Sequence, residues 1–376
     1  MTAAEPVAIV GGGPAGMALA LALHRQGMPA RIFEARRRGD VRQDARILAL
    51  SHGSRLILET LGVWAQIEAT PILHIHISQR GGFGRTRLSA AEQGLPALGY
   101  VVPAASLSNA LDAALLAAGV PYLERTQVER VDCSDAGARA HTGAGEVGAH
   151  LVVYAEGAAG LDAEACSRDY GQSAVVCHVE LALPHGNCAW ERFTPDGPLA
   201  LLPLGAGMSV VYTCPSVDAE LLGLLDDADF IIRLQAQFGS RLRFVGATPR
   251  HVYPLALRYR RSPVAVRSVW IGNAAQTLHP VAGQGFNLAL RDIAQLSTIL
   301  AGRPDPGAAA VLQAYAAARR LDRLAGIRCT DALARLFVLD WPLAQTARGA
   351  GLAALDLLPP LRGFLARRMI FGARAW

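Results

Sequence analysis

The pattern of apolar and polar positions near the N-terminus predicts a strand, a glycine-rich turn and a helix. An apolar run at residues 7–10 leads into the turn at 11–16, and helical apolar periodicity follows at 17–26. A second short strand is expected at 30–33, and a helix at 54–68. This alternation of strands and helices predicts an α/β fold.

Farther along the chain, apolar and polar residues alternate with the period of a β-strand at residues 74–78, 174–179, 199–204 and 208–213. These segments predict a mostly antiparallel sheet inserted into the α/β unit. The remaining expected elements are a helix at 107–118, strands at 151–155 and 268–271, and helices from Gln284 onward, interrupted at 302–307 and 358–360. Long loops are expected only around 80–99 and 157–169.

The first glycine turn has the spacing of a strand–turn–helix unit that binds the pyrophosphate of a dinucleotide. Gly11 allows the tight turn, Gly13 lets the backbone approach a phosphate, and Gly16 permits close packing of the helix. The N-terminus of that helix supplies positive potential. Glu34 ends the second strand, where a carboxylate can accept hydrogen bonds from ribose hydroxyls. The turn therefore predicts a bound dinucleotide, either FAD or NAD.

A second glycine-rich segment, residues 271–287, predicts the other half of a flavin site. The strand before it delivers Asn273 to its carboxyl end, where open α/β sheets bind ligands. His279 and Pro280 predict an extended turn, and we interpret His279 as shaping that turn rather than transferring protons. The glycines at 283–285 let the backbone approach a flat ring, and the next helix directs its N-terminal amides toward it. We therefore expect the two glycine turns to meet on one cofactor.

Composition narrows the remaining classes of function. The net charge is +5, and arginines cluster at 36–38, 258–261 and 362–374 without a nucleic-acid-binding motif. Such clusters are most simply solvated surface, and as binding sites they favour anionic lipid or an acidic partner over nucleic acid. No uncharged apolar run is long enough to span a membrane, and the first strand starts too early for a signal segment, so we expect a cytoplasmic location. The six cysteines are scattered, which predicts neither disulfides nor a metal site.

The two glycine segments resemble those of the aromatic-ring flavoprotein monooxygenases. The string from His279 to Asn287, HPVAGQGFN, is similar to the signature of the ubiquinone-biosynthesis hydroxylases. Further similar strings lie at 44–51, 70–78, 169–172 and 191–203, so the resemblance covers almost the whole chain. They are similar to the UbiH-like branch, which acts on 2-polyprenyl-6-methoxyphenol.

This resemblance implies a fold of the para-hydroxybenzoate hydroxylase type. Residues 1–75, 99–165 and 250–330 would form a discontinuous FAD-binding, Rossmann-like domain, with a substrate-binding sheet domain at 76–98 and 166–249 and a C-terminal helical segment at 331–376. The implied enzyme binds FAD noncovalently, is reduced by NAD(P)H and forms a C4a-hydroperoxide with O2. It would then hydroxylate the ring of a polyprenylated methoxyphenol, or alternatively a different aromatic ring.

The resemblance also assigns roles to individual positions. It places Glu34 on the ribose, Arg46 on the pyrophosphate and ring region, and Asn273 on the ribityl chain. Without the resemblance, Arg46 could also be a residue of a surface ion pair. It assigns the loop at the reacting face of the flavin to Pro280, Gln284 and Gly285, with no catalytic base. The full predicted cofactor-binding set is Gly11, Gly13, Pro14, Ala15, Gly16, Glu34, Arg46, Glu156, Asn273, Ala275, Pro280, Gly283, Gly285, Phe286 and Asn287.

One segment departs from the family pattern. The family usually has Asp-Gly followed by Ser and Arg after the strand at 151–155, whereas this chain has Glu156-Gly157-Ala-Ala-Gly160. Glutamate keeps the charge but places it farther out, and loss of the Ser hydroxyl removes a hydrogen bond worth about 1 kcal/mol. We expect FAD binding to survive and reduction by NAD(P)H to weaken. The alternative from another class is a flavin-binding, weakly catalytic scaffold subunit of a quinone-biosynthesis complex.

The C-terminal stretch, residues 349–376, combines apolar residues with arginines. It predicts either a helix that caps the fold or a segment that rests on a membrane surface or on a lipid-binding partner, as a polyprenyl substrate would require. The second interpretation implies a peripheral location on the inner face of the membrane, with other ubiquinone-biosynthesis proteins as partners.

Overall fold

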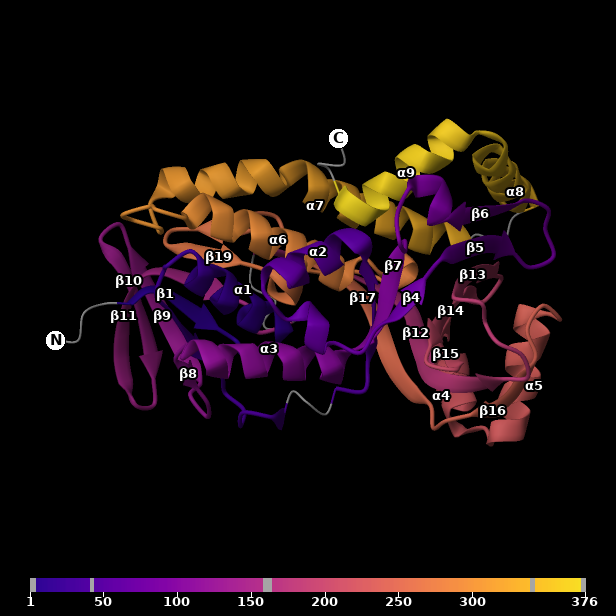
Figure 1. Cartoon of the computed structure of the whole chain (residues 1–376), viewed down its shortest axis with the longest axis horizontal. Coiled ribbons are helices and arrows are strands. Elements are labelled where there is room, and N and C mark those ends of the chain that lie inside the picture. The colour runs from indigo at the N-terminus through magenta and orange to yellow at the C-terminus, as the bar shows by residue number, and fades with distance from the viewer. Residues whose placement is uncertain (1–4, 41–43, 158–163, 339–341, 373–376) are drawn as a thin grey trace.

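The computed structural model describes residues 5–40, 44–157, 164–338 and 342–372, and it contains two large sheets that lie beside each other (Figure 1). The first sheet has eight strands. Its order is β18 (Val264–Ala265), β19 (Ser268–Trp270), β11 (Gly145–Tyr154), β1 (Glu5–Val10), β2 (Ala30–Phe33) and β8 (Tyr122–Leu123). The strands from β19 to β8 run parallel, so their carboxyl ends lie at one edge of the sheet.

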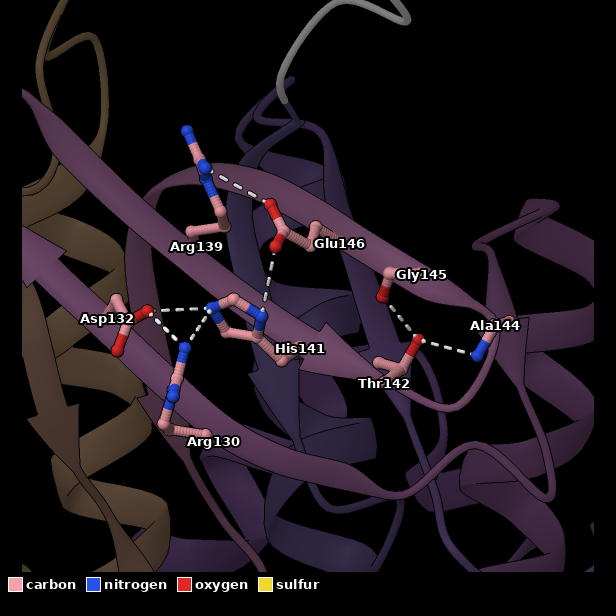
Figure 2. Close-up of polar contacts among 8 residues, drawn as sticks. All are labelled: Arg130, Asp132, Arg139, His141, Thr142, Ala144, Gly145 and Glu146. Atoms are coloured by element: carbon pink, nitrogen blue, oxygen red, sulfur yellow. Dashed lines mark hydrogen bonds and ion pairs between the residues drawn. The ribbon is translucent and has the colours of Figure 1, made fainter.

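An antiparallel extension lengthens one side of this sheet. β9 (Val128–Ser134) pairs with β10 (Gly137–Thr142), and β10 pairs with β11. Figure 2 shows the charged side chains on this surface: Asp132 Oδ2 lies 2.9 Å from Arg130 and 2.8 Å from His141, while Glu146 lies 3.3 Å from His141 and 3.1 Å from Arg139. Such exposed pairs contribute little stability each, so they chiefly fix the register of the extension.

Helices cover the parallel part of the sheet because each presents an apolar stripe to it. α1 (Pro14–Arg25) packs against both α3 (Ala104–Ala118) and α6 (Gly285–Leu300). Together with the strands they form the largest apolar core, in which Ile9, Leu19 and Ile293 are fully buried. α6 is thus fixed against the helix that follows the first glycine turn.

The second sheet has nine strands and is mostly antiparallel. Its order is β20 (Gln276–Thr277), β17 (His251–Arg260), β12 (Ala165–Leu181), β15 (Gly207–Pro215), β14 (Gly197–Leu204), β13 (Cys188–Thr194), β5 (His74–Gln79) and β6 (Arg85–Ser89), with β16 (Phe244–Ala247) also paired to β12. α4 (Ser216–Leu224) and α5 (Asp227–Phe238) cover one face and share a core with it. The opposite face looks toward the first sheet and the loops at its edge (Figure 1).

A small sheet joins the two large ones. It consists of β3 (Ile47–Ser51), β7 (Gly99–Pro103) and β4 (Thr70–Ile72). Val101 and Ile72 of this sheet pack with Ala189 of β13. The remaining short elements are α2 (His52–Thr60) and the 3-10 turns η2 (Trp64–Gln66), η3 (Ala91–Gln93), η4 (Gly272–Ala274) and η5 (Val281–Gly283).

The C-terminal helices run from the first sheet to the far end of the second (Figure 1). α7 (Ala309–Val338) contacts α6, β18 and β14 and so bridges the two sheets. α8 (Pro342–Leu357) packs on β5 and β6, and α9 (Pro359–Phe371) packs on α2 and η3. Within the described ranges, no helix is both long and apolar enough to cross a lipid bilayer.

Most of the expected elements are present, but two expectations are wrong. The helix expected at 54–68 ends at Thr60, because Gly62 takes a positive φ of 76° that a continuing helix does not allow. The long loop expected at 80–99 contains β6, whose residues alternate between exposed and buried and pair with β5, as well as η3. In the loop expected at 157–169, β12 already begins at Ala165, while residues 158–163 lie outside the described part.

Candidate functional site

Four parallel strands end at the same edge of the first sheet, and each is followed by a residue that the sequence singles out. β1 leads to Gly11, β2 to Glu34, β11 to Glu156 and β19 to Gly272. Ligands of open α/β sheets bind at this edge, where loops diverge from the strand ends. The register of the sheet therefore brings together residues that are distant in sequence.

The first glycine turn is shaped by close backbone contacts. Gly11 has a φ of 108°, and a Cβ at this position would lie 2.6 Å from the nitrogen of Glu156. A Cβ on Gly16 would lie 2.0 Å from the carbonyl oxygen of Gly11. Around Gly13, by contrast, no described atom lies within 4 Å of a built Cβ, so its outer side is open. Gly11 and Gly16 thus hold the turn together, and Gly13 leaves room for a ligand.

This difference gives a prediction for two matched substitutions. Gly13 has an extended backbone, φ −73° and ψ 179°, so Gly13→Ala should fold normally but place a methyl group where a phosphate would approach. We expect its Kd for FAD to rise by at least about tenfold, with the melting temperature of the FAD-free protein unchanged. Gly16→Ala should lose both FAD affinity and about 1–3 kcal/mol of stability. Fluorescence titration and thermal melts check both, and equal melting losses would contradict the assignment for Gly13.

Glu34 is a buried carboxylate beside this turn. Its Oε2 accepts a hydrogen bond from the Gly12 nitrogen at 2.7 Å, and its Oε1 accepts from the backbone nitrogen and Nε of Arg36, each at 3.0 Å. Burial alone would raise the pKa of Glu34, but the hydrogen bonds from Arg36 and Gly12 outweigh it and hold the pKa below its usual value. Glu34 is therefore ionised, and a carboxylate with about four acceptor positions keeps capacity for a ribose hydroxyl.

The second glycine segment lies directly against the first. A Cβ on Gly272 would lie 3.3 Å from the Cβ of Ala15, at the start of α1, and 3.6 Å from that of Ala289 in α6. Gly283 has a φ of 58°, and a Cβ built on it would lie 3.1 Å from the Cβ of Ala49 in β3. The Gly272 turn therefore lies beside the start of α1, as a cofactor shared by the two turns would require.

The surface between the turns is open to a ligand. Asn273 and Pro280 are exposed, and no described atom lies within 4 Å of a Cβ built on Gly285. Ala275 is buried and closes the η4 turn through a 3.0 Å bond from its nitrogen to Gly272. Phe286 packs against the main core and so orients the first turn of α6.

Asn287 holds this loop in place through four hydrogen bonds. Its Nδ2 donates to the carbonyl oxygens of Ala49 at 2.8 Å and Gly283 at 2.7 Å. Its Oδ1 accepts from the Ser51 nitrogen and from Ser54 Oγ, both at 2.7 Å. The side chain is buried, and its polar atoms are used by the protein itself. The geometry indicates that its side chain positions the loop, so a predicted flavin contact would fall to its backbone amide.

His279 is neutral and shapes the turn. Its Nδ1 accepts a hydrogen bond from the Val281 nitrogen at 3.1 Å, and burial lowers its pKa to about 4. The ring meets Tyr170 edge-on, with centroids 5.3 Å apart. These contacts support the interpretation of His279 as a turn residue rather than a proton carrier.

A buried polar network fixes the segment between the strand and the loop. Asp292 of α6 accepts from Arg319 Nε at 2.6 Å and from Gln276 Nε2 at 2.7 Å. Arg323 Nε donates to Gln276 Oε1 at 2.8 Å, which ties β20 to α7. Arg291 Nε contacts Asp322 at 2.9 Å. The sequence does not predict this network, because the arginines of α7 cannot be told from surface residues by periodicity.

The chain matches the protein-family model described as FAD binding domain over residues 4–325. The chain belongs to that family. Its residues fit the cofactor: an open glycine turn for phosphates, an ionised carboxylate for ribose, and an open glycine at a helix N-terminus for a flat ring. The predicted fold class, the FAD cofactor and the resemblance are thereby confirmed.

Two curated relatives cover nearly the whole chain. Ubiquinone hydroxylase UbiL of Rhodospirillum rubrum is 35% identical, with 96% of this chain and 88% of UbiL covered. The 3-demethoxyubiquinol 3-hydroxylase of Escherichia coli is 32% identical, with 93% of this chain and 94% of the relative covered. This chain is thus similar to both along its full length.

Solved structures show the same fold. The p-nitrophenol 4-monooxygenase PnpA of Pseudomonas putida superposes with a TM-score of 0.78 at 18% identity, covering 99% of both chains. PqsL, a probable FAD-dependent monooxygenase of Pseudomonas aeruginosa, gives 0.74 at 23% identity, covering 93% of this chain and 99% of PqsL. At these identities the likeness concerns the fold.

Two of the residues assigned from the family resemblance, Arg46 and Glu156, are exposed. Arg46 is exposed and binds Asp44 through Nε, at 2.9 and 3.0 Å, and through Nη2 at 2.6 Å. A role as a clamp on FAD would require Arg46 to share or leave Asp44. Glu156 is exposed beside the Gly11 turn, and partial desolvation together with the nearby Glu34 raises its pKa. Both assignments stay predictions.

The sequence did not single out Glu191, which lies in β13 on the face that looks toward the flavin loop. Alternation along β13 places Ala189, Glu191 and Phe193 on that face, since Ala189 packs with the small sheet and Phe193 packs with Val281 of η5. Trp190, on the other face, packs against Phe238 of α5, with centroids 5.6 Å apart.

The carboxyl group of Glu191 has an apolar setting. Its cross-strand neighbours are Ile77 and Ala200, and its Oε1 is buried without a hydrogen-bond partner among the described residues. Burial raises its pKa to about 7. An acid whose pKa is near neutrality, on the face of β13 that packs against η5, is a candidate for proton handling. Glu191 is the first residue of the segment 191–203 that resembles the UbiH-like branch, and this position is the signal in the sequence that could indicate it.

Proposed function

We propose that this protein is an FAD-dependent monooxygenase that hydroxylates the aromatic ring of a polyprenylated methoxyphenol in ubiquinone biosynthesis. The observation that carries the proposal is similarity to two ubiquinone hydroxylases over nearly the whole chain. It is supported by the second glycine turn, where no described atom lies within 4 Å of a Cβ built on Gly285, so that a flat ring would have room. When bound and reduced by NAD(P)H, FAD supplies the chemistry that inserts one atom of O2 into an electron-rich ring. The protein binds, orients and shields the reactants.

The residues of the site divide these tasks. Gly13 would give a phosphate access to the backbone, and Glu34 would receive the ribose. The N-terminal amides of α6, which Asn287 holds in position, would stabilise negative charge on a bound ring. Val281 and Phe193 pack together and exclude water between the loop and β13.

In this proposal Glu191 handles the proton of the substrate phenol. With a pKa of about 7 it is partly ionised at neutral pH, so an Oε atom can accept the phenolic proton and leave the ring oxygen electron-rich. A more electron-rich ring reacts faster with an electrophilic oxygen. The apolar neighbours Ile77 and Ala200 suit the ring carbons of such a substrate.

The test follows the oxidation of NAD(P)H by the FAD-loaded protein, anaerobically and in air, with and without a short-chain 2-prenyl-6-methoxyphenol. We expect the phenol to accelerate flavin reduction and the product to be one oxygen atom heavier by mass spectrometry. Gly13→Ala serves as a folded control with weakened FAD binding. Tightly bound FAD that NADH and NADPH both fail to reduce would overturn the proposal and favour the scaffold alternative, which the Glu156-Gly157 departure suggests.

A further inference from the structure

A cavity separate from the candidate flavin site lies at the far end of the second sheet. It has a volume of about 520 Å³ and lies between the β5–β6 hairpin, β13, the loop after α5 and the end of α8. Its charged and polar lining includes Gln79, Arg85, Arg192, Arg241 and Asp356, and its rim includes Leu357. We call it the arginine pocket. Because Arg192 points to the α5 side of β13 and Glu191 to the other, the arginine pocket is distinct from the flavin site.

The arginine pocket carries positive charge that the protein does not neutralise. Within the described ranges, Arg85, Arg192 and Arg241 form no ion pair with a carboxylate, and Asp356 instead contacts Arg362 at 3.6 Å. Burial, then the neighbouring cations Arg241 and Arg80, lower the pKa of Arg192. Like charges gathered around a cavity repel one another, so an anion bound there would be stabilised by all of them.

Two of these arginines, Arg192 and Arg241, are also held in position. Arg192 Nε donates to the Gln237 carbonyl at 3.1 Å, and Arg241 Nη1 lies 2.8 Å from His76 Nε2, with its guanidinium over the Trp190 ring at 5.9 Å. Each guanidinium has five N–H donors, so these contacts leave donors for a ligand. Anchored, partly used guanidinium groups are typical of phosphate recognition.

The hairpin and α8 close the arginine pocket together. Gln79 Nε2 donates to the Phe83 carbonyl at 2.9 Å and to the Gln345 carbonyl at 3.1 Å. A Cβ on Gly84 would lie 2.1 Å from the carbonyl oxygen of Gly349, which shows how closely the hairpin meets α8. The cavity is therefore part of the packed structure of the C-terminal helices.

An exposed apolar ridge begins at the rim of the arginine pocket. Leu357 is 78% exposed, and the ridge continues along α9 with Leu358, Leu361, Phe364, Leu365 and Met369, which are 39–51% exposed. The spacing of Leu361, Leu365 and Met369 follows one face of α9. Arg362, Arg367 and Arg368 accompany the ridge. An apolar helical stripe with arginines beside it is typical of a helix that lies in the surface of an anionic membrane.

We propose that the arginine pocket binds the phosphate of an anionic phospholipid while the ridge on α8 and α9 inserts among the acyl chains. A phosphate group satisfies the arginines, and the attached chains explain why large apolar residues are exposed at the rim. The inference concerns a site that the hydroxylation chemistry does not use.

The test is co-sedimentation of the FAD-loaded, full-length protein with vesicles of phosphatidylcholine alone or mixed with phosphatidylglycerol. We expect binding mainly to the mixed vesicles. The Arg85→Gln/Arg241→Gln variant should bind about 25-fold more weakly, from about fivefold for each arginine near the surface. The matched control, Arg87→Gln/Arg243→Gln, removes the same charge from exposed positions outside the pocket and should lose much less. Retained FAD shows that each variant is folded.

Two further arms separate the sources of phosphate. The ridge variant Leu361→Ser/Phe364→Ser should lose vesicle binding, while inorganic phosphate should raise the melting temperature of this variant and of the wild type equally. Equal vesicle binding by the pocket and control variants would overturn the proposal in favour of general charge attraction. Vesicle binding unaffected by the ridge variant would overturn it in favour of a free phosphate or phosphorylated metabolite.

Discussion

Replacing Asn287 with alanine should destabilise the protein and release FAD. The substitution leaves four groups without their partner, the Ser51 nitrogen, Ser54 Oγ and the carbonyl oxygens of Ala49 and Gly283. Buried polar groups that lose a partner cost about 1–3 kcal/mol each, and some of these will find a replacement, so we expect a loss on the order of 3–5 kcal/mol. Urea unfolding followed by circular dichroism measures it.

The same variant should bind FAD much more weakly even where it is folded, because the Gly283 turn and the start of α6 lose their link to β3. Asn109→Ala, at an exposed position of α3, is the matched control and should change neither quantity. An Asn287→Ala protein of lower stability but with unchanged FAD affinity would show that the loop is held by other contacts, and the positioning role would then be wrong.

Replacing Glu191 with glutamine should reduce hydroxylation and flatten its dependence on pH. If Glu191 accepts the phenolic proton, kcat/KM of the wild type rises with pH through about 7, the value to which burial raises its pKa. Glutamine cannot accept that proton, so we expect a loss on the order of 100-fold at neutral pH and no rise near pH 7. A pH–rate profile with a short-chain prenyl phenol checks this.

Glu191→Gln should lower the rate of hydroxylation but raise the stability of the protein above pH 7. These opposite effects distinguish a chemical role of Glu191 from a structural one. The folded protein favours protonated Glu191, so the contribution of this group to the free energy of unfolding is full below its ordinary pKa of 4.5 and is lost as pH rises toward about 7. Neutral glutamine lacks this dependence and should make the protein more stable than wild type above pH 7. Glu129→Gln, exposed on β9, is the control. If Glu191→Gln were less stable than the wild type at every pH, the idea that the Glu191 carboxyl is uncharged and lacks a hydrogen-bond partner would be wrong.

Helices and strands could be predicted from the sequence where clear signals mark their ends. The strand at 30–33 was placed correctly because a short apolar run is bounded by Gly27 and by the charged residues after Phe33. Helix α1 begins at Pro14, three residues before its apolar periodicity becomes visible, since proline suits the first turn of a helix. The sequence pattern does not predict strand β6. Arg85 and Arg87 occupy its exposed positions, and the two buried residues, Thr86 and Leu88, give too weak an alternation.

The candidate site was predictable to the extent that it depends on backbone. Glycines at 11, 16, 272 and 283 mark close approaches within the chain, and Gly13 marks an open position in the first turn. The parallel register of the first sheet brings the two turns together. The roles of Asn287 and Glu191 could not be inferred, since one depends on partners more than two hundred residues away and the other on which face of β13 meets the loop. Both facts belong to tertiary packing, and periodicity carries no information about them.

The strand order of the first sheet has a consequence for biosynthesis. The central strand β1 is made first, but its neighbour β11 ends at Tyr154 and the next strand, β19, ends at Trp270. The apolar N-terminal segments must therefore wait for most of the chain to emerge from the ribosome before their sheet can close. Contacts between such distant segments form slowly and leave apolar surface exposed meanwhile. A nascent chain therefore exposes apolar surface of this sheet until β19, which ends at Trp270, has emerged.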